Sequence, residues 1–179
     1  MTHSHLLRSS LALLLLGAAC SDNPAVEQPG SDGGTGDLAM TAGSDGGGTD
    51  NSAAGLTAFV KAGSYKSWKA EPAIHASTGP HGGNVRTYVN ALLYASLKAG
   101  NVSHPKGSIV VKELYGSGTT TLTGHAVDIK DEVSGEWVFY EGFAPGYSSP
   151  YYFRGTSNFC ASCHSPGKDY VLTPASAIP

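Results

Sequence analysis

The sequence predicts an α+β domain in which a few short helices accompany an antiparallel, strand-rich sheet. Residues 108–115, 121–129 and 136–143 alternate apolar and polar side chains in the manner of strands. Gly, Ser and Asp residues separate the three segments, and this hairpin-like spacing favours antiparallel pairing. The remaining elements are expected to precede these strands.

Two helices and a further strand are predicted ahead of the three segments. Leu56, Phe59 and Val60 have the spacing of one helical face, and this helix is predicted to extend toward Trp68. Residues 85–89 alternate like a short strand. Residues 91–97 are predicted to form a second helix, which Lys98-Ala99-Gly100 would end.

The N-terminal 19 residues resemble a processing signal and are excluded from the fold. The apolar core of this segment, residues 11–16, is too short to cross a bilayer. It is followed by Gly17-Ala18-Ala19-Cys20, which has the form of a bacterial lipobox and predicts lipidation of Cys20. The alternative is ordinary cleavage after Ala19, which would leave the Cys20 thiol unmodified.

Residues 20–54 are expected to form a flexible linker, because they are rich in Gly, Asp and Ser and contain no aromatic residue. The folded domain is therefore predicted to cover residues 55–179. Six of the 14 acidic residues and one of the 11 basic residues precede this domain, so it is close to neutral. Its basic residues form no stripe that indicates a nucleic-acid partner.

The run Cys160-Ala161-Ser162-Cys163-His164 has the form of a covalent haem c attachment site. Two thiols at this spacing can bond to the porphyrin vinyl groups, and His164 then supplies an axial imidazole to the iron. A zinc site usually needs a second cysteine pair, and a thioredoxin-like motif usually follows an early strand. A redox-active disulfide between Cys160 and Cys163 remains the main alternative.

The sixth iron ligand determines which function a haem here would have. Both methionines, Met1 and Met40, precede the domain, which argues against the methionine ligation common in electron-transfer cytochromes. We therefore expect a five-coordinate iron that is open to small molecules. Ligation by a second histidine is the alternative, and the candidates in the domain are His75, His81, His104 and His125.

An ordered set of segments resembles the cytochrome P-460 family and its relative cytochrome c-prime beta. The resemblance implies a strand-rich, usually homodimeric domain with a C-terminal haem c, and in cytochrome P-460 itself the oxidation of hydroxylamine. The set covers most of the domain, and its members are His81-Gly82, Val85 to Asn90, Pro105 to Leu114, Gly135 to Tyr140, Cys160 to His164 and Asp169 to Val171.

Lys112 follows from this resemblance as a further site residue, whereas Glu141, Tyr152 and Phe153 are candidates because of their own positions in the sequence. Lys112 matches the lysine that becomes bonded to the porphyrin edge in cytochrome P-460, although a lysine that only extends from the sheet to solvent is the alternative. Alternation places Lys112 on one strand face with Val110, and Glu113 on the other. Glu141 is a candidate distal base, or a rim residue facing water. Tyr152 and Phe153 are expected to pack against the haem.

Three functions are compatible with these residues. The first is a haem-dependent oxidoreductase that acts on hydroxylamine or nitric oxide and passes electrons to a partner cytochrome. The second is a protein that only binds nitric oxide, and the third is a small electron carrier. In each case the sequence predicts an exported bacterial lipoprotein, periplasmic or associated with the outer membrane.

Overall fold

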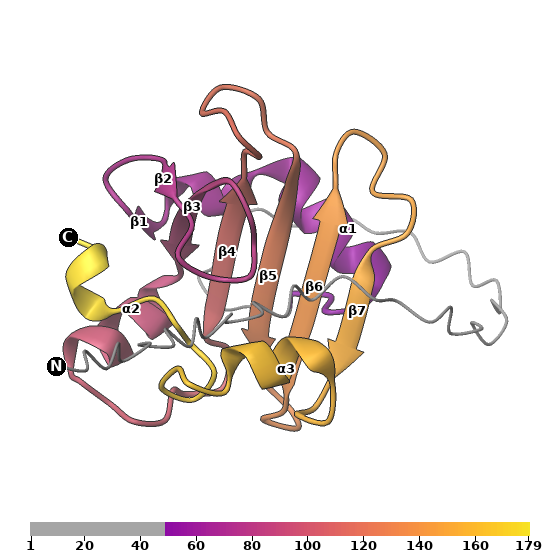
Figure 1. The fold of residues 1–179 in the computed structure, drawn as a ribbon. Helices are drawn as coiled ribbons and strands as arrows, with labels where there is room; N and C mark the ends of the chain where they lie inside the picture. Colours follow the sequence, from indigo (N-terminus) through magenta and orange to yellow (C-terminus); the bar gives the residue numbers. More distant parts are fainter. Residues whose placement is uncertain (1–48) are drawn as a thin grey trace, which may run out of the picture. The chain divides into compact units, whose positions relative to one another are not determined.

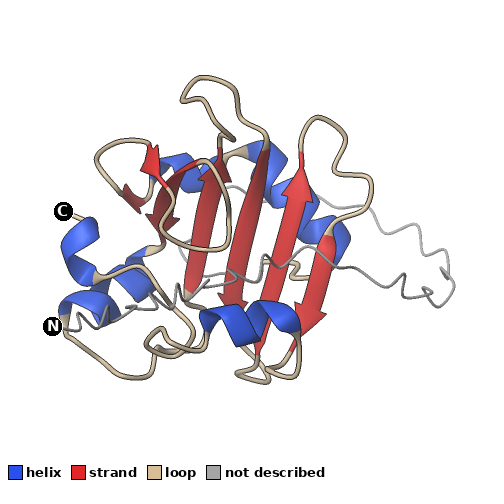
Figure 2. Cartoon of the chain, viewed as in Figure 1, coloured by secondary structure: helices blue, strands red, loops and turns tan. Residues whose placement is uncertain are grey.

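The computed structural model describes residues 49–179, which form one seven-stranded antiparallel sheet with three short α-helices (Figures 1 and 2). This arrangement confirms the predicted α+β fold class. The predicted signal peptide and Cys20 lie outside the described residues. Within residues 49–179, no helix has both the length and the apolar character needed to cross a membrane.

The strands follow the chain across most of the sheet, in the order β1-β3-β4-β5-β6-β7, with β2 also paired to β3. Short connections between sequential antiparallel strands explain this order, because each strand pairs with the one that it meets next. The strands are β1 (Lys69–Ala70), β2 (His75–Ala76), β3 (Asn84–Val89), β4 (Ile109–Leu114), β5 (Gly124–Lys130), β6 (Trp137–Phe143) and β7 (Tyr151–Arg154).

The first helix begins earlier than the sequence predicts. It is α1 (Ala53–Ala62), and the Ser52 side chain accepts a hydrogen bond from Gly55 N at its start. Gly63 ends it in the left-handed conformation, with φ of 72°, and a 3-10 turn at Ser64–Ser67 follows. The folded part therefore includes the last residues assigned to the linker, and the helix stops before Trp68.

An asparagine side chain caps the start of each of the other two helices. Asn90 accepts a hydrogen bond from Leu93 N at the start of α2 (Ala91–Lys98). Asn158 does the same for Ala161 N at the start of α3 (Phe159–His164), at 2.9 Å. A short 3-10 turn at Ala175–Ala177 lies near the C-terminus.

The sheet separates two hydrophobic cores. One core lies between α1 and the sheet and contains Leu56, Val111 and Val127. The other lies on the opposite face and contains Val110, Phe139 and Ala161, where α2, α3 and the C-terminal segment cover the strands. In Figure 1, α1 is seen behind the sheet and α3 in front of it. The predicted functional residues are divided between these two faces.

Candidate functional site

The two cysteines of the C-x-x-C-H run lie on the short helix α3. They are separated by three positions, so they project from the same side of the helix. Both are half-buried, and Cys160 packs against the core on this face of the sheet. His164 is the last residue of the helix and is buried. The fold therefore presents two thiols and an imidazole along one short helix.

The His164 ring is oriented by groups around its Nδ1 atom. This nitrogen lies 3.0 Å from the backbone oxygen of Tyr170 and 3.3 Å from Oδ2 of Asp128. The ring also contacts Phe139 edge-on, with centroids 5.6 Å apart. With acceptors at Nδ1, the proton belongs on that nitrogen, and Nε2 is left as the nitrogen that can bind a metal.

The loop after α3 is held in a conformation that aims the Tyr170 carbonyl at His164. Asp169 and Tyr170 have φ of 46° and 68°, a region that bulky residues rarely adopt and that is often found at functional sites. Asp169 is fixed by Lys130 at 2.6 Å and by Trp137 Nε1 at 3.1 Å. These contacts from β5 and β6 stabilise the turn.

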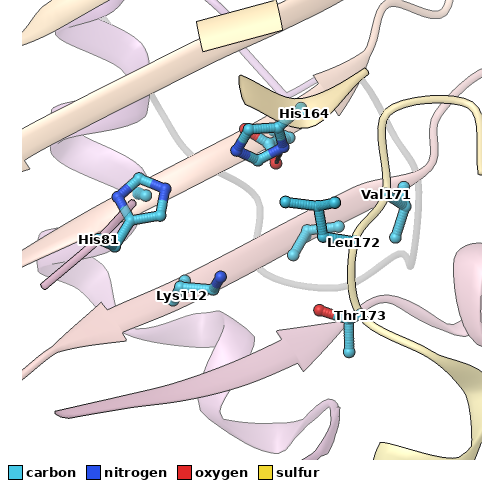
Figure 3. A pocket seen from close by; sticks show the side chains of 9 residues that line it. His81, Lys112, His164, Val171, Leu172 and Thr173 are labelled. Atoms are coloured by element: carbon cyan, nitrogen blue, oxygen red, sulfur yellow. Dashed lines mark ion pairs between the residues drawn. The ribbon is translucent and has the colours of Figure 1, made fainter. Parts of the chain in front are cut away.

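His164 and Lys112 line one small cavity, with a volume of about 10 Å³. Figure 3 shows these two side chains and that of His81 around the same hollow. The lining combines polar and apolar groups from β4, β5, α3, the loop before β3 and the C-terminal segment. It consists of His81, Val110, Lys112, Ala126, Asp128, His164, Val171, Leu172 and Thr173.

Strand register explains why these side chains share a face. Lys112 lies opposite Ala126, which in turn lies opposite Glu141. In the neighbouring row, Asp128 lies between Val110 and Phe139. Because alternate residues of paired strands point the same way, Lys112, Asp128 and Glu141 are on the side of the sheet that carries α3.

Glu141 reaches the cavity through His81. Its Oε1 atom lies 3.1 Å from His81 Nδ1, and the two side chains are only 19% and 13% exposed. The sequence placed His81 in a Gly- and Pro-rich loop, where exposure is the usual outcome. The structure instead folds this loop over the sheet, so that His81 and Glu141 form a largely buried pair beside His164.

The two aromatic residues expected to contact a haem are on different faces. Phe153 lies opposite Phe139 and contacts Phe159 of α3, with ring centroids 4.9 Å apart. Tyr152 is placed on the other face, where it packs against the α1 core and donates a hydrogen bond to Asn51 O at 2.8 Å. Tyr152 therefore does not join the site, because adjacent residues of a strand point in opposite directions.

Three of the four candidate histidine ligands lie away from His164. His125 is buried on the α1 side, between the hydroxyls of Tyr65 and Tyr147. His104 is buried, and its Nδ1 atom lies 2.9 Å from the hydroxyl oxygen of Ser96 in α2. His75 is exposed and pairs with Glu71. Only His81, among the four, lines the cavity with His164.

Comparison of the chain with protein-family models, with curated proteins and with solved structures found no match. The functional argument therefore depends on the chemistry of the residues at the site.

Within residues 49–179, no three His, Cys, Asp or Glu side chains gather as ligands for a bare metal ion. A haem iron needs fewer protein ligands, because the porphyrin supplies its equatorial ligands and the protein supplies only the axial ones. Asp128 is a neighbour of His164 that the sequence prediction missed. Its signal was present, since it is an acidic residue between the apolar Val127 and Ile129 of a buried strand.

Proposed function

We propose that Cys160 and Cys163 attach one haem c covalently, with His164 as an axial ligand of the iron. We further propose that the adjoining cavity binds or oxidises small nitrogen species such as hydroxylamine or nitric oxide. One observation carries the proposal: Lys112 of β4 and His164 of α3, far apart in the sequence, line the same cavity. The resemblance to the cytochrome P-460 family supports it, because that resemblance assigns both residues to the haem.

The residues around the cysteines fit a covalently attached haem. Cys160 and Cys163 project from one side of α3, as two bonds to the edge of one macrocycle require. His164 follows directly, with Nδ1 held by Tyr170 O and its other nitrogen available. Metal-binding histidines usually donate their second ring N–H to a carbonyl or a carboxylate in this way.

A haem bound here would supply an iron that coordinates a small nitrogen species and exchanges electrons with a partner cytochrome. The chain's own groups would handle charge and protons. Oxidation of hydroxylamine releases protons as well as electrons, and the Glu141 carboxylate with His81 at 3.1 Å can accept them. The Lys112 ammonium can donate hydrogen bonds to a polar ligand or, as the resemblance implies, form a bond to the porphyrin edge.

A second candidate function is reversible binding of nitric oxide without turnover. The apolar part of the cavity lining favours it, since Val110, Val171 and Leu172 suit a small, weakly polar gas. This function needs neither a porphyrin bond to Lys112 nor a partner cytochrome. We also propose that the protein is an exported lipoprotein anchored through Cys20, because haem c is attached outside the bacterial cytoplasm, and that it forms a homodimer, as the resemblance implies.

The test is to produce the full chain in a bacterium that can attach haem c and to measure the mass of the purified protein by mass spectrometry. We expect the mass of the processed polypeptide plus one haem, and loss of covalent haem in Cys160→Ser and Cys163→Ser. Consumption of hydroxylamine with an added electron acceptor would support the oxidoreductase, whereas a spectral response to nitric oxide alone would support the binding protein. A chain that carries no haem would contradict the proposal.

A further inference from the structure

His81 faces His164 across the cavity at a distance that one metal ion can bridge. The two ring centroids are 6.0 Å apart and the ring planes are nearly perpendicular, at 77°. Both side chains are largely buried, with exposed fractions of 13% and 8%. Figure 3 shows the two imidazoles approaching the hollow from different elements. This separation also occurs in ordinary edge-on ring contacts, so a shared metal is indicated by how each ring is held.

The two imidazoles have the same hydrogen-bonding pattern. His164 has Tyr170 O and Asp128 Oδ2 at its Nδ1, and His81 has Glu141 Oε1 at its Nδ1. Each ring is thus oriented through one nitrogen by a carbonyl or a carboxylate, which is how metal-binding histidines are usually held. Among the described residues, no hydrogen bond to Nε2 is formed by either ring, so both rings keep the nitrogen that a metal needs.

The spacing matches two axial ligands of one iron. A metal–imidazole bond is about 2 Å long, and the ring centre lies about 1 Å beyond the bonded nitrogen. Two imidazoles on opposite sides of a metal therefore have centroids about 6 Å apart, close to the 6.0 Å between His81 and His164.

We infer that His81 is the sixth ligand of the haem iron at rest, and that small molecules bind by displacing it. This inference rests on the proposed function, since it needs a haem on Cys160 and Cys163, and it replaces the open sixth position that the sequence suggested. The exchange breaks the bond from the iron to His81 and forms one from the iron to the incoming molecule. Glu141 then holds the released imidazole beside the ligand through the contact at His81 Nδ1.

The loop that carries His81 is closed by a hydrogen bond at its base and has open space around two of its glycines. Ser77 N donates to Gly83 O at 2.8 Å, which closes the loop at its two ends. Gly83 adopts φ of +82° against the backbone of Gly116, where any side chain would clash. Gly79 and Gly82, in contrast, have no atoms within contact distance of the position a side chain would take. The space around these two glycines would allow His81 to be displaced while the loop stays attached at its base.

The experiment compares the ferric spectra of the purified full chain and of His81→Ala. We expect a low-spin, six-coordinate spectrum for the unsubstituted protein, by absorption and by electron paramagnetic resonance, and a high-spin spectrum for His81→Ala. Added imidazole should restore the low-spin form of the variant. His75→Ala is the matched control, because His75 precedes the same loop but is exposed, and it should keep the low-spin spectrum.

Ligand binding provides a second readout. If His81 occupies the iron for nine-tenths of the time, it weakens the apparent affinity for an incoming ligand about tenfold. Carbon monoxide should therefore bind the reduced His81→Ala protein about tenfold more tightly than the reduced unsubstituted protein.

Three outcomes would overturn the inference. A covalently attached haem that is high-spin in the unsubstituted protein would remove His81 as a ligand while leaving the proposed function intact. A low-spin His81→Ala protein that becomes high-spin only when Lys112 is also replaced would assign the position to the lysine. A chain without covalent haem would overturn the proposed function and the inference together.

Discussion

His125 Nε2 lies 2.7 Å from the hydroxyl oxygen of Tyr65, on the sheet face that packs against α1 and away from His164. The Tyr65 hydroxyl also lies 2.7 Å from Glu113 Oε1, to which it donates its proton. Tyr65 must therefore accept from Nε2, and His125 Nδ1 accepts from the Tyr147 hydroxyl at 2.7 Å. These bonds form a directed chain that fixes His125 as a neutral structural residue.

Replacement of Tyr65 by Phe should destabilise the protein, because it removes a hydrogen bond to a buried carboxylate. Glu113 is 2% exposed and also accepts from the hydroxyls of Tyr88 and Tyr115. Hydrogen bonds to charged groups contribute about 1.5–3 kcal/mol, so we expect a loss of about 2 kcal/mol in the free energy of unfolding, measured with urea.

Tyr94→Phe is the matched control for Tyr65→Phe. Its hydroxyl donates to the backbone oxygen of Pro179 in an exposed position, where water replaces the lost partner, so its effect should be small. Equal urea midpoints for Tyr65→Phe and the unsubstituted protein would contradict the assigned role of Tyr65.

Stability should fall on acidification because His125 is buried without charge. Burial lowers its pKa to about 4, from 6.5 in the unfolded chain. Between these values the unfolded state binds a proton that the folded state does not, so stability decreases as pH falls from 6.5 toward 4. The pKa difference corresponds to roughly 3 kcal/mol. Urea midpoints measured across this pH range test the expectation.

His125→Gln should have a flatter pH profile between pH 6.5 and 4 than the unsubstituted protein. His75→Gln is the control, since the backbone oxygen of Ala76 and then Glu71 raise the pKa of the exposed His75, which favours the folded state at low pH. Replacing His75 should therefore not reduce the loss of stability on acidification. If stability depends on pH equally steeply in His125→Gln, other groups cause the loss of stability on acidification.

The local patterns of the sequence predicted much of the sheet correctly. The alternation of β4 placed Val110 and Lys112 on one face and Glu113 on the other, and the register confirms this division. The C-x-x-C-H run could be recognised by spacing alone. Both features are local, because a strand's period of two and a helical offset of three depend only on neighbouring residues.

Long-range contacts were not accessible in the same way. Tyr152 was assigned to the site because the run Tyr151 to Phe153 is uniformly aromatic and gives no polar alternation to orient it. His81 was not preferred over the other histidines, because nothing in its loop indicates that the loop folds over β6 to meet Glu141. The full burial of His125 likewise depends on tyrosines supplied by distant segments.

Asp128→Asn should raise the reduction potential of the haem that we propose. Its carboxylate lies 3.3 Å from His164 Nδ1, and an anionic partner there makes the imidazole a stronger donor, which favours oxidised iron. We expect a rise on the order of 50 mV, close to a tenfold change in the redox equilibrium. Potentiometric titration measures it, and Glu132→Gln, at an exposed position, should leave the potential unchanged.

Lys112→Ala should separate the two candidate functions. If Lys112 is bonded to the porphyrin edge, the unsubstituted protein has a red-shifted Soret band and the variant has an ordinary haem c spectrum. Hydroxylamine oxidation should then be lost as well, while nitric oxide binding persists. Lys61→Ala, on the exposed surface of α1, should change neither property. Hydroxylamine oxidation that survives in Lys112→Ala would contradict a catalytic role for the lysine.

The absorption spectrum of the reduced full chain, purified from a host that attaches haem c, tests the central proposal most directly. The proposal predicts the bands of one covalently bound haem, present with Cys160 and Cys163 intact and altered by nitric oxide. A spectrum without haem bands would contradict it and would favour the alternative that Cys160 and Cys163 form a redox-active disulfide.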